Sequence, residues 1–124
     1  MNEIPIYIIS CDEQRKKRMK ARFNKLNIKP KFNCFTDISN IESQFNITLT
    51  IPDKCMLSHM DSIQKFYNSN KPLGIICEDD IYIHKNFNEE IEKIITFINQ
   101  NNYDIVLLSY LLNYKPPNCY HNLI

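Results

Sequence analysis

The sequence has little net charge, no long apolar run and no closely spaced cysteine pair, and each absence excludes a class of protein. Its 15 basic and 14 acidic residues leave a formal net charge of +1. With 44% hydrophobic residues, this excludes a disordered chain, a charged tail protein and a nucleic-acid coat, so no nucleic-acid partner is expected. The longest apolar run, about six residues at Ile4–Ile9, is far shorter than the roughly 20 residues that cross a bilayer. Length and composition instead predict one small globular domain over residues 1–124, without a membrane span.

The cysteines are widely spaced, odd in number and never arranged as Cys-x-x-Cys. This pattern argues against a disulfide framework and against a zinc cluster. We therefore expect reduced packing residues at all five positions, namely Cys11, Cys34, Cys55, Cys77 and Cys119. The N-terminal apolar run lacks a basic lead and a small-residue cleavage site, so it predicts a first strand rather than a secretory signal, and the expected location is cytoplasmic.

Charge is divided unevenly along the chain. Residues 1–31 hold nine Lys or Arg residues against three acids, whereas residues 32–124 hold six against eleven. A basic N-terminal segment beside an acidic remainder could place an anionic ligand near the first and a cation near the second. Charge alone is also compatible with a solvated helix face that binds nothing, so the sequence motifs are needed to choose between these two interpretations.

Hydrophobic patterning predicts alternating strands and helices. Continuous β-branched runs predict buried strands, and apolar residues at helical spacing predict helices. The expected strands are Ile4–Ile9, Lys31–Phe35, Pro72–Cys77 and Asp104–Leu108, and the expected helices are Glu13–Leu26, Lys54–Asn68 and Asn86–Asn101. Residues 37–53 are polar and weakly patterned and remain unassigned. The order predicts an α/β fold, a three-layer αβα sandwich with a mostly parallel sheet.

Local signals support these helices. Asp12 precedes the first helix and is a suitable N-cap, as Asn86 is for the last. The second helix is predicted from a stripe with a period of 3.6 residues, formed by Met56, Met60, Ile63 and Tyr67.

Three consecutive acids, Glu78, Asp79 and Asp80, end the strand predicted at Pro72–Cys77. Ligands of open α/β sheets bind at the carboxyl ends of the strands. Adjacent carboxylates repel one another, and a hard cation such as Mg²⁺ or Mn²⁺ relieves that repulsion. Because side chains alternate along a strand, Glu78 and Asp80 are predicted to face the ligand and Asp79 the other side. An exposed loop without a role is the alternative.

The acidic triplet is accompanied by two further motifs. Tyr7–Ser10 leads into a basic helix, Cys55–His59 reads Cys-Met-Leu-Ser-His, and Leu73–Asp80 is an apolar strand that ends in Glu-Asp-Asp. Their order and spacing resemble glycosyltransferase family 25, which includes enzymes of lipooligosaccharide and lipopolysaccharide biosynthesis and the collagen β-galactosyltransferases. The resemblance covers about residues 4–110.

The resemblance implies a GT-A-type domain in which the acidic motif holds Mn²⁺, or Mg²⁺, against the diphosphate of a UDP-sugar. By motif match, Asp80 and Glu78 are the metal ligands, and Glu78 also lies at the donor. Asp79 and His59 are the implied catalytic candidates. A lone histidine on a predicted helix is more often structural than a ligand or base, so a structural role for His59 is the alternative.

Further candidates lie near the ends of the first and third strands. Ser10, Arg15 and Arg18 follow the first strand and are candidate donor contacts, with plain solvation as the alternative for the arginines. His84 follows Asp80 by four residues and could reach the same ion. Ser58 has no acid-base partner at suitable spacing, which argues against a serine hydrolase.

The predicted function is metal-dependent transfer of a sugar from a nucleotide sugar to a glycan or to a hydroxylysine-type protein acceptor. Only 44 residues follow Asp80, so we expect a donor-binding half that is incomplete at its C-terminus. The alternative is a catalytically incompetent nucleotide-sugar-binding or interaction module. A receiver or phosphatase would need a downstream Lys and Ser/Thr set that is not convincing here.

Overall fold

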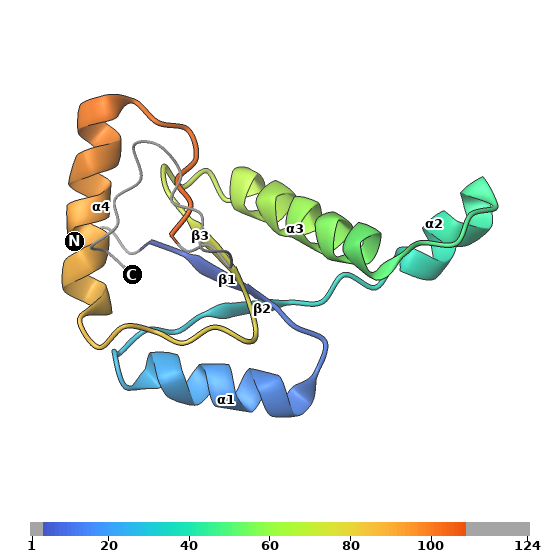
Figure 1. Cartoon of the computed structure of the whole chain (residues 1–124), viewed down its shortest axis with the longest axis horizontal. Helices are drawn as coiled ribbons and strands as arrows, with labels where there is room; N and C mark the ends of the chain where they lie inside the picture. The colour runs from blue at the N-terminus through green and yellow to red at the C-terminus, as the bar shows by residue number, and fades with distance from the viewer. Residues whose placement is uncertain (1–3, 109–124) are drawn as a thin grey trace, which may run out of the picture. The chain divides into compact units, whose positions relative to one another are not determined.

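The computed structural model describes residues 4–108, which form an α/β fold with a parallel sheet of three strands and with four helices. The elements in chain order are β1 (Ile6–Ile9), α1 (Glu13–Asn24), β2 (Lys31–Asn33), α2 (Ile38–Phe45), α3 (Ile51–Asn68), β3 (Ile75–Glu78) and α4 (Phe87–Asn101) (Figure 1). The chain folds as two compact units, Met1–Tyr82 with the sheet and Ile83–Ile124 with α4. The predicted α/β class and parallel sheet are confirmed.

β1 is the central strand of the sheet, whose order is β2-β1-β3. Ile8 pairs with Phe32 on one side and with Cys77 on the other, and both pairings are parallel. The consecutive residues Ile6, Tyr7 and Ile8 are all buried. Because successive side chains of a strand point to opposite faces, both faces of β1 are covered, as the uninterrupted apolar run predicts.

α1 and α3 lie on opposite sides of the sheet (Figure 1). The connection from β1 to β2 crosses the sheet in one direction, and the connection from β2 to β3 returns past β1 in the other. Right-handed crossovers then place their helices on opposite faces. α1 buries Met19 and Phe23. Its predicted N-cap is confirmed, since Oδ1 of Asp12 accepts a hydrogen bond from the backbone N–H of Arg15 at 2.8 Å.

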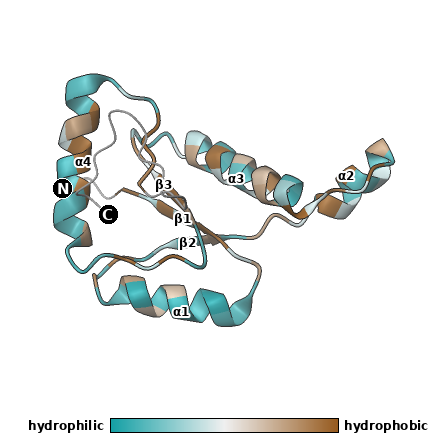
Figure 2. Cartoon of the chain, viewed as in Figure 1, coloured by the Kyte–Doolittle hydropathy of each residue, from teal (hydrophilic) through white to brown (hydrophobic). Residues whose placement is uncertain are grey.

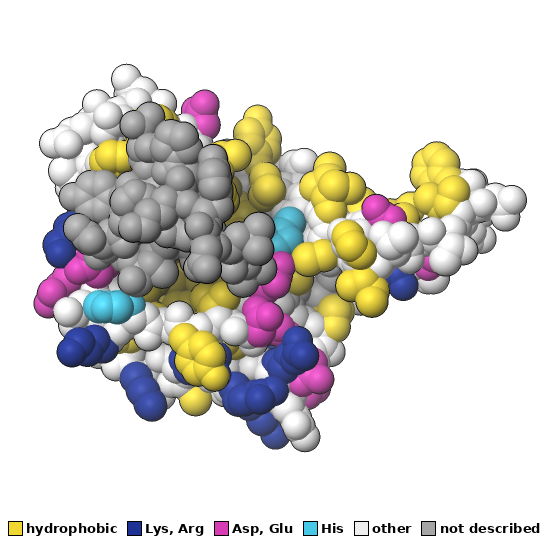
Figure 3. Space-filling model, in the orientation of Figure 1, with side chains coloured by type: hydrophobic (Ala, Val, Ile, Leu, Met, Phe, Trp, Pro, Cys, Tyr) yellow, Lys and Arg dark blue, Asp and Glu magenta, His cyan; other side chains and the backbone are white. Residues whose placement is uncertain are grey.

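α3 packs a largely polar face on the sheet and leaves an apolar stripe in solvent. The helix begins at Ile51, earlier than predicted, because Thr50 and Asp53 form a capping box. Ser62 is fully buried, and α3 contacts both β1 and β3. The stripe that predicted the helix is 50 to 75% exposed and consists of Met56, Met60, Ile63 and Tyr67. Hydrophobic side chains accordingly lie along α3 and α2 on the face shown in Figure 3.

The strand predicted at Asp104–Leu108 is not formed, so that prediction is wrong. Ile105 and Leu107 are 80% and 74% exposed. An apolar run of about five residues becomes a strand only when a neighbouring strand satisfies its backbone, and hydrophobicity alone does not supply that partner. The unassigned residues 37–53 contain α2 and the first turn of α3.

A disulfide between Cys11 and Cys34 corrects the expectation that all the cysteines are reduced. Their Cα atoms are 4.9 Å apart although 23 residues separate them in sequence. Cys11 lies two residues after β1, and Cys34 directly follows β2. The parallel pairing of these strands brings the two thiols together, which cysteine spacing could not show. Cys55 and Cys77 are free thiols, and Cys119 lies outside the described residues.

In the second unit, α4 is an amphipathic helix with apolar residues at intervals along a polar surface (Figure 2). Asn86 occupies the N-cap position as predicted, but its side chain makes no capping hydrogen bond. Ile94 is buried, and the helix ends at Asn102 in a left-handed conformation with φ of 54°. Between residues 4 and 108, no helix combines the length and the apolar character needed to cross a membrane.

Candidate functional site

The carboxyl ends of all three strands lie at one edge of the sheet. The parallel register aligns Ile9 with Asn33 on one side and with Glu78 on the other. Ser10, Asn33 and the segment Glu78–Asp80 therefore meet at the edge where open α/β sheets bind their ligands.

Asp79 joins the end of β3 to the end of β1. Its Oδ2 accepts a hydrogen bond from Ser10 Oγ at 2.7 Å, and its Oδ1 lies 3.2 Å from Nη1 of Arg15. Ser10 is buried and the Asp79 side chain is only 13% exposed, whereas that of Arg15 is 52% exposed. The structure thus brings together three residues singled out from the sequence, and Asp79 holds two loops of the edge in place.

Glu78 meets two residues of α3. Its Oε1 accepts a hydrogen bond from Cys55 Sγ at 3.2 Å and lies 3.1 Å from Nε2 of His59. Cys55 and His59 are four residues apart and so share one face of the helix. The hydrogen bonds from His59 and then Cys55 hold the pKa of Glu78 below its usual range. The Cys-Met-Leu-Ser-His motif and the acidic motif therefore converge on one carboxylate.

Asp80 is exposed and acts on the same group of side chains. The pKa of the Cys55 thiol is raised, first by its hydrogen bond to Glu78, then by burial, and further by the charges of Glu78 and Asp80. The charge of Asp80 therefore acts on Cys55, whereas Asp79 contacts Ser10 and Arg15.

For the two other candidates, the structure shows different contacts. Arg18 is exposed on α1, and its charge adds to the lowering of the pKa of Asp12, which comes mainly from the backbone N–H of Arg15. Figure 3 shows Lys and Arg side chains gathered over α1. His84 belongs to the second unit, where its Nδ1 accepts a hydrogen bond from the backbone N–H of Asn86 at 3.1 Å.

A polar network at the end of β2 was missed by sequence reasoning. The buried Asn33 donates from Nδ2 to Asp61 Oδ2 and to Ser62 Oγ, each at 2.8 Å. Its Oδ1 accepts a hydrogen bond from Lys65, which also pairs with Asp61 at 3.2 Å. The sequence did contain a signal for this polar face of α3, because Cys55 and Ser62 are two helical turns apart and so lie on the same face of the helix. The apolar stripe on another face of α3 was more conspicuous.

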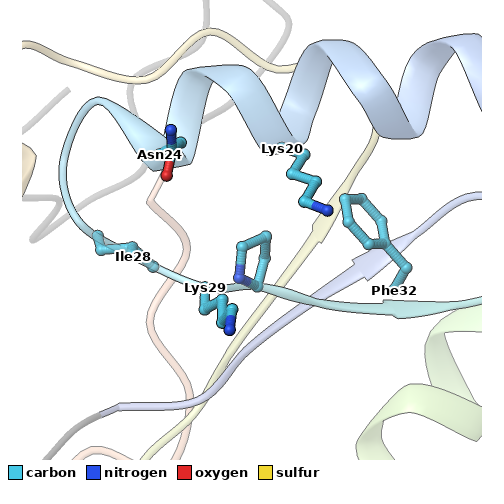
Figure 4. Close-up of a pocket in the computed structure, with 6 residues that line it drawn as sticks. Lys20, Asn24, Ile28, Lys29 and Phe32 are labelled. Atoms are coloured by element: carbon cyan, nitrogen blue, oxygen red, sulfur yellow. The ribbon is translucent and has the colours of Figure 1, made fainter.

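A pocket between α1 and the segment entering β2 lies away from this edge. It is lined by Lys20, Asn24, Ile28, Lys29, Pro30 and Phe32 (Figure 4). Residues 28–30 precede β2, so the pocket lies toward the amino end of the strand, opposite Asn33. None of the polar residues described above lines it.

The described residues form an α/β domain with a parallel sheet, and three consecutive acids lie at the carboxyl end of β3. Residues 42–120 match the family model described as glycosyltransferase family 25 (LPS biosynthesis protein). The match spans more than half of the chain, so the protein belongs to glycosyltransferase family 25, as its motifs predicted. The matched range contains Cys55–His59 and Glu78–Asp80 but not Ser10 or Arg15. No curated protein and no solved structure matches the chain.

Proposed function

We propose that the protein binds a nucleotide sugar, UDP-linked, at the carboxyl edge of a GT-A-type sheet and transfers the sugar to a glycan or to a hydroxylated protein side chain. The observation that carries this proposal is the convergence of both family motifs on Glu78, through Cys55 and His59. Family membership supports the reaction class.

The carboxylates of this edge fit a hard divalent cation, Mn²⁺ or Mg²⁺. Both contacts of Glu78 use Oε1, and within residues 4–108 its Oε2 makes no hydrogen bond. Asp80 is exposed, whereas both oxygens of Asp79 are engaged. Glu78 and Asp80 are therefore the proposed ligands, and an ion held by them would neutralise charge on the leaving diphosphate.

The remaining residues of the edge would orient the donor. Arg15 stands on the first turn of α1, where its guanidinium is fixed by Asp79 yet half exposed. A guanidinium in this position can hydrogen-bond phosphate oxygens, and Arg18 adds positive charge on the same helix. Asp79 positions Arg15 and Ser10, and His59 positions Glu78, so both act by fixing groups that would contact the donor.

The test is calorimetric titration of UDP with and without Mn²⁺. We expect metal chelation to weaken UDP binding, and Asp80→Asn to remove about tenfold or more of the metal-dependent affinity while the exposed site leaves the fold intact. Asp104→Asn removes the same charge from an exposed position of the second unit and is the matched control. Equal UDP affinity with and without Mn²⁺ in the folded protein would contradict the shared-metal proposal.

Transfer is measured separately as UDP release with and without galactosyl glycans or hydroxylysine peptides. Acceptor-stimulated release supports transfer. Donor binding with only slow, acceptor-independent release would instead identify a binding module.

A further inference from the structure

Three donor atoms of different chemistry meet at the end of β3. Sγ of Cys55, Nε2 of His59 and a carboxylate oxygen of Glu78 all lie within 4.8 Å of one another. Two of the three edges of this triangle are 3.2 Å and 3.1 Å long. The triangle is distinct from the Glu78 and Asp80 pair because it includes a sulfur and an imidazole nitrogen.

These separations suit a tetrahedral metal. Zinc lies about 2.3 Å from sulfur and about 2.0–2.2 Å from nitrogen or oxygen, which places neighbouring ligand atoms roughly 3.3–3.6 Å apart. The edges of 3.2 Å and 3.1 Å need to lengthen by only a few tenths of an ångström, and the third edge is at most 4.8 Å. Side-chain rotation can supply shifts of this size without moving the backbone.

The donor set selects the kind of ion. Thiolate and imidazole are the ligands that zinc prefers, whereas Mg²⁺ and Mn²⁺ prefer oxygen alone. The expectation from sequence that no zinc cluster is present rested on the absence of closely spaced cysteine pairs. Here one cysteine is combined instead with a histidine of the same helix and a carboxylate from β3.

The scaffold holds the donors firmly and leaves them accessible. Cys55 and His59 lie one turn apart on α3, and the buried pair of Ser62 and Asn33 ties that helix to β2. The side chains of His59 and Glu78 are 36% and 46% exposed, which gives an ion a path from solvent.

We propose that Cys55, His59 and Glu78 form a zinc-binding site whose fourth position is open to water or to a ligand oxygen. On binding, Cys55 releases its thiol proton to solvent and coordinates as the thiolate. The site needs no nucleotide sugar, and it shares only Glu78 with the proposed ligands of the hard cation.

The experiment titrates the folded, unreduced protein with Zn²⁺ alone against a chromogenic chelator, and with Co²⁺ as a spectroscopic probe. A Cys119→Ser background removes the thiol outside the described residues. We expect one equivalent of metal and a thiolate-to-cobalt charge-transfer band. Cys55→Ser should abolish the band and weaken Zn²⁺ binding at least about tenfold, and His59→Gln should weaken it similarly.

The chain offers matched controls for both substitutions. Cys77→Ser removes the other free thiol of the described residues, and His84→Gln removes a histidine of the second unit, and both should leave Zn²⁺ affinity unchanged. Asp80→Asn should keep the thiolate-to-cobalt band and the stoichiometry of one metal, because Asp80 supplies none of the three donor atoms, and this separates the site from the UDP-binding metal whatever the fate of that proposal. Absence of the cobalt band in the parent protein, or equal Zn²⁺ affinity in parent and Cys55→Ser, would overturn the zinc site, and His59→Gln gives an independent answer if Cys55→Ser misfolds.

Discussion

Removal of the Cys11–Cys34 disulfide should destabilise the first unit chiefly through its unfolded chain. The bond closes a loop with a sequence separation of 23 residues, for which the chain-entropy relation gives about 3 kcal/mol at 25 °C. In the folded state the same strand ends are also joined by the hydrogen bond from the backbone N–H of Ser10 to the carbonyl of Asn33, at 3.0 Å. The native edge therefore keeps a second tie when the disulfide is lost.

The assay is urea unfolding followed by circular dichroism in the Cys119→Ser background. The double variant Cys11→Ser with Cys34→Ser should lose about 3 kcal/mol and show a steeper denaturant dependence, because its unfolded chain exposes more surface. A reducing agent should destabilise the parent by a similar amount and leave the double variant unchanged. Cys55→Ser, which removes a free thiol, should respond to the reducing agent as the parent does.

A count of free thiols tests directly whether Cys11 and Cys34 form a disulfide. Denatured but unreduced Cys119→Ser protein should show two titratable thiols, those of Cys55 and Cys77. A count of four, with a urea midpoint that does not respond to reducing agent, would show that Cys11 and Cys34 are not bonded.

Two further predictions concern β3 and its approach. Gly74→Ala would place a Cβ 2.6 Å from Cδ2 of the Phe66 ring, and the forced ring shift should cost about 1–3 kcal/mol in urea unfolding. A Gly74→Ala protein as stable as the parent would show that the ring moves freely. Burial raises the pKa of Cys77 to about 12, so at pH 9 only about one thiol in a thousand is ionised and alkylation, followed by mass spectrometry, should be far slower than in urea. Rapid alkylation of Cys77 in the native protein would contradict its burial. Since the pKa of Cys77 in the folded protein lies above its unfolded value, the stability that depends on this protonated thiol should be present below pH 9.0 and lost as the pH rises toward about 12.

Elements with a simple hydrophobic pattern could be predicted from the sequence, and elements that depend on partners could not. The uninterrupted run before Ser10 identified β1, and capping with helical spacing identified α1 and α4. The segment Asp104–Leu108 has the composition of a strand but pairs with no strand among residues 4–108. α2 carries Ile38, Ile41 and Phe45 at helical spacing, but polar residues around them diluted the signal.

The residues of the site likewise divide into those that could be predicted from the sequence and those that could not. Glu78–Asp80 could be recognised because acids that end an apolar strand are unusual, and the nearby motif pointed to His59. The partners of these residues depend on register and helix orientation. Asn33 meets Asp61 only because α3 packs its polar face on the sheet, a choice that the exposed stripe of Met56 and Met60 gave no reason to expect.

The central position of β1 has a consequence for the order of events during synthesis. Tyr7 finds its first partner in Lys31, but Ile6 waits for Ile75, about 70 residues further along the chain. At about 5–20 residues per second, the ribosome needs roughly 4–14 s to make that stretch. Throughout this interval one edge of an apolar strand remains open to other chains, a hazard that parallel sheets with distant partners share. Among the three described strands, β1 is therefore synthesised before the other two, yet its pairing is complete only once β3 has been made.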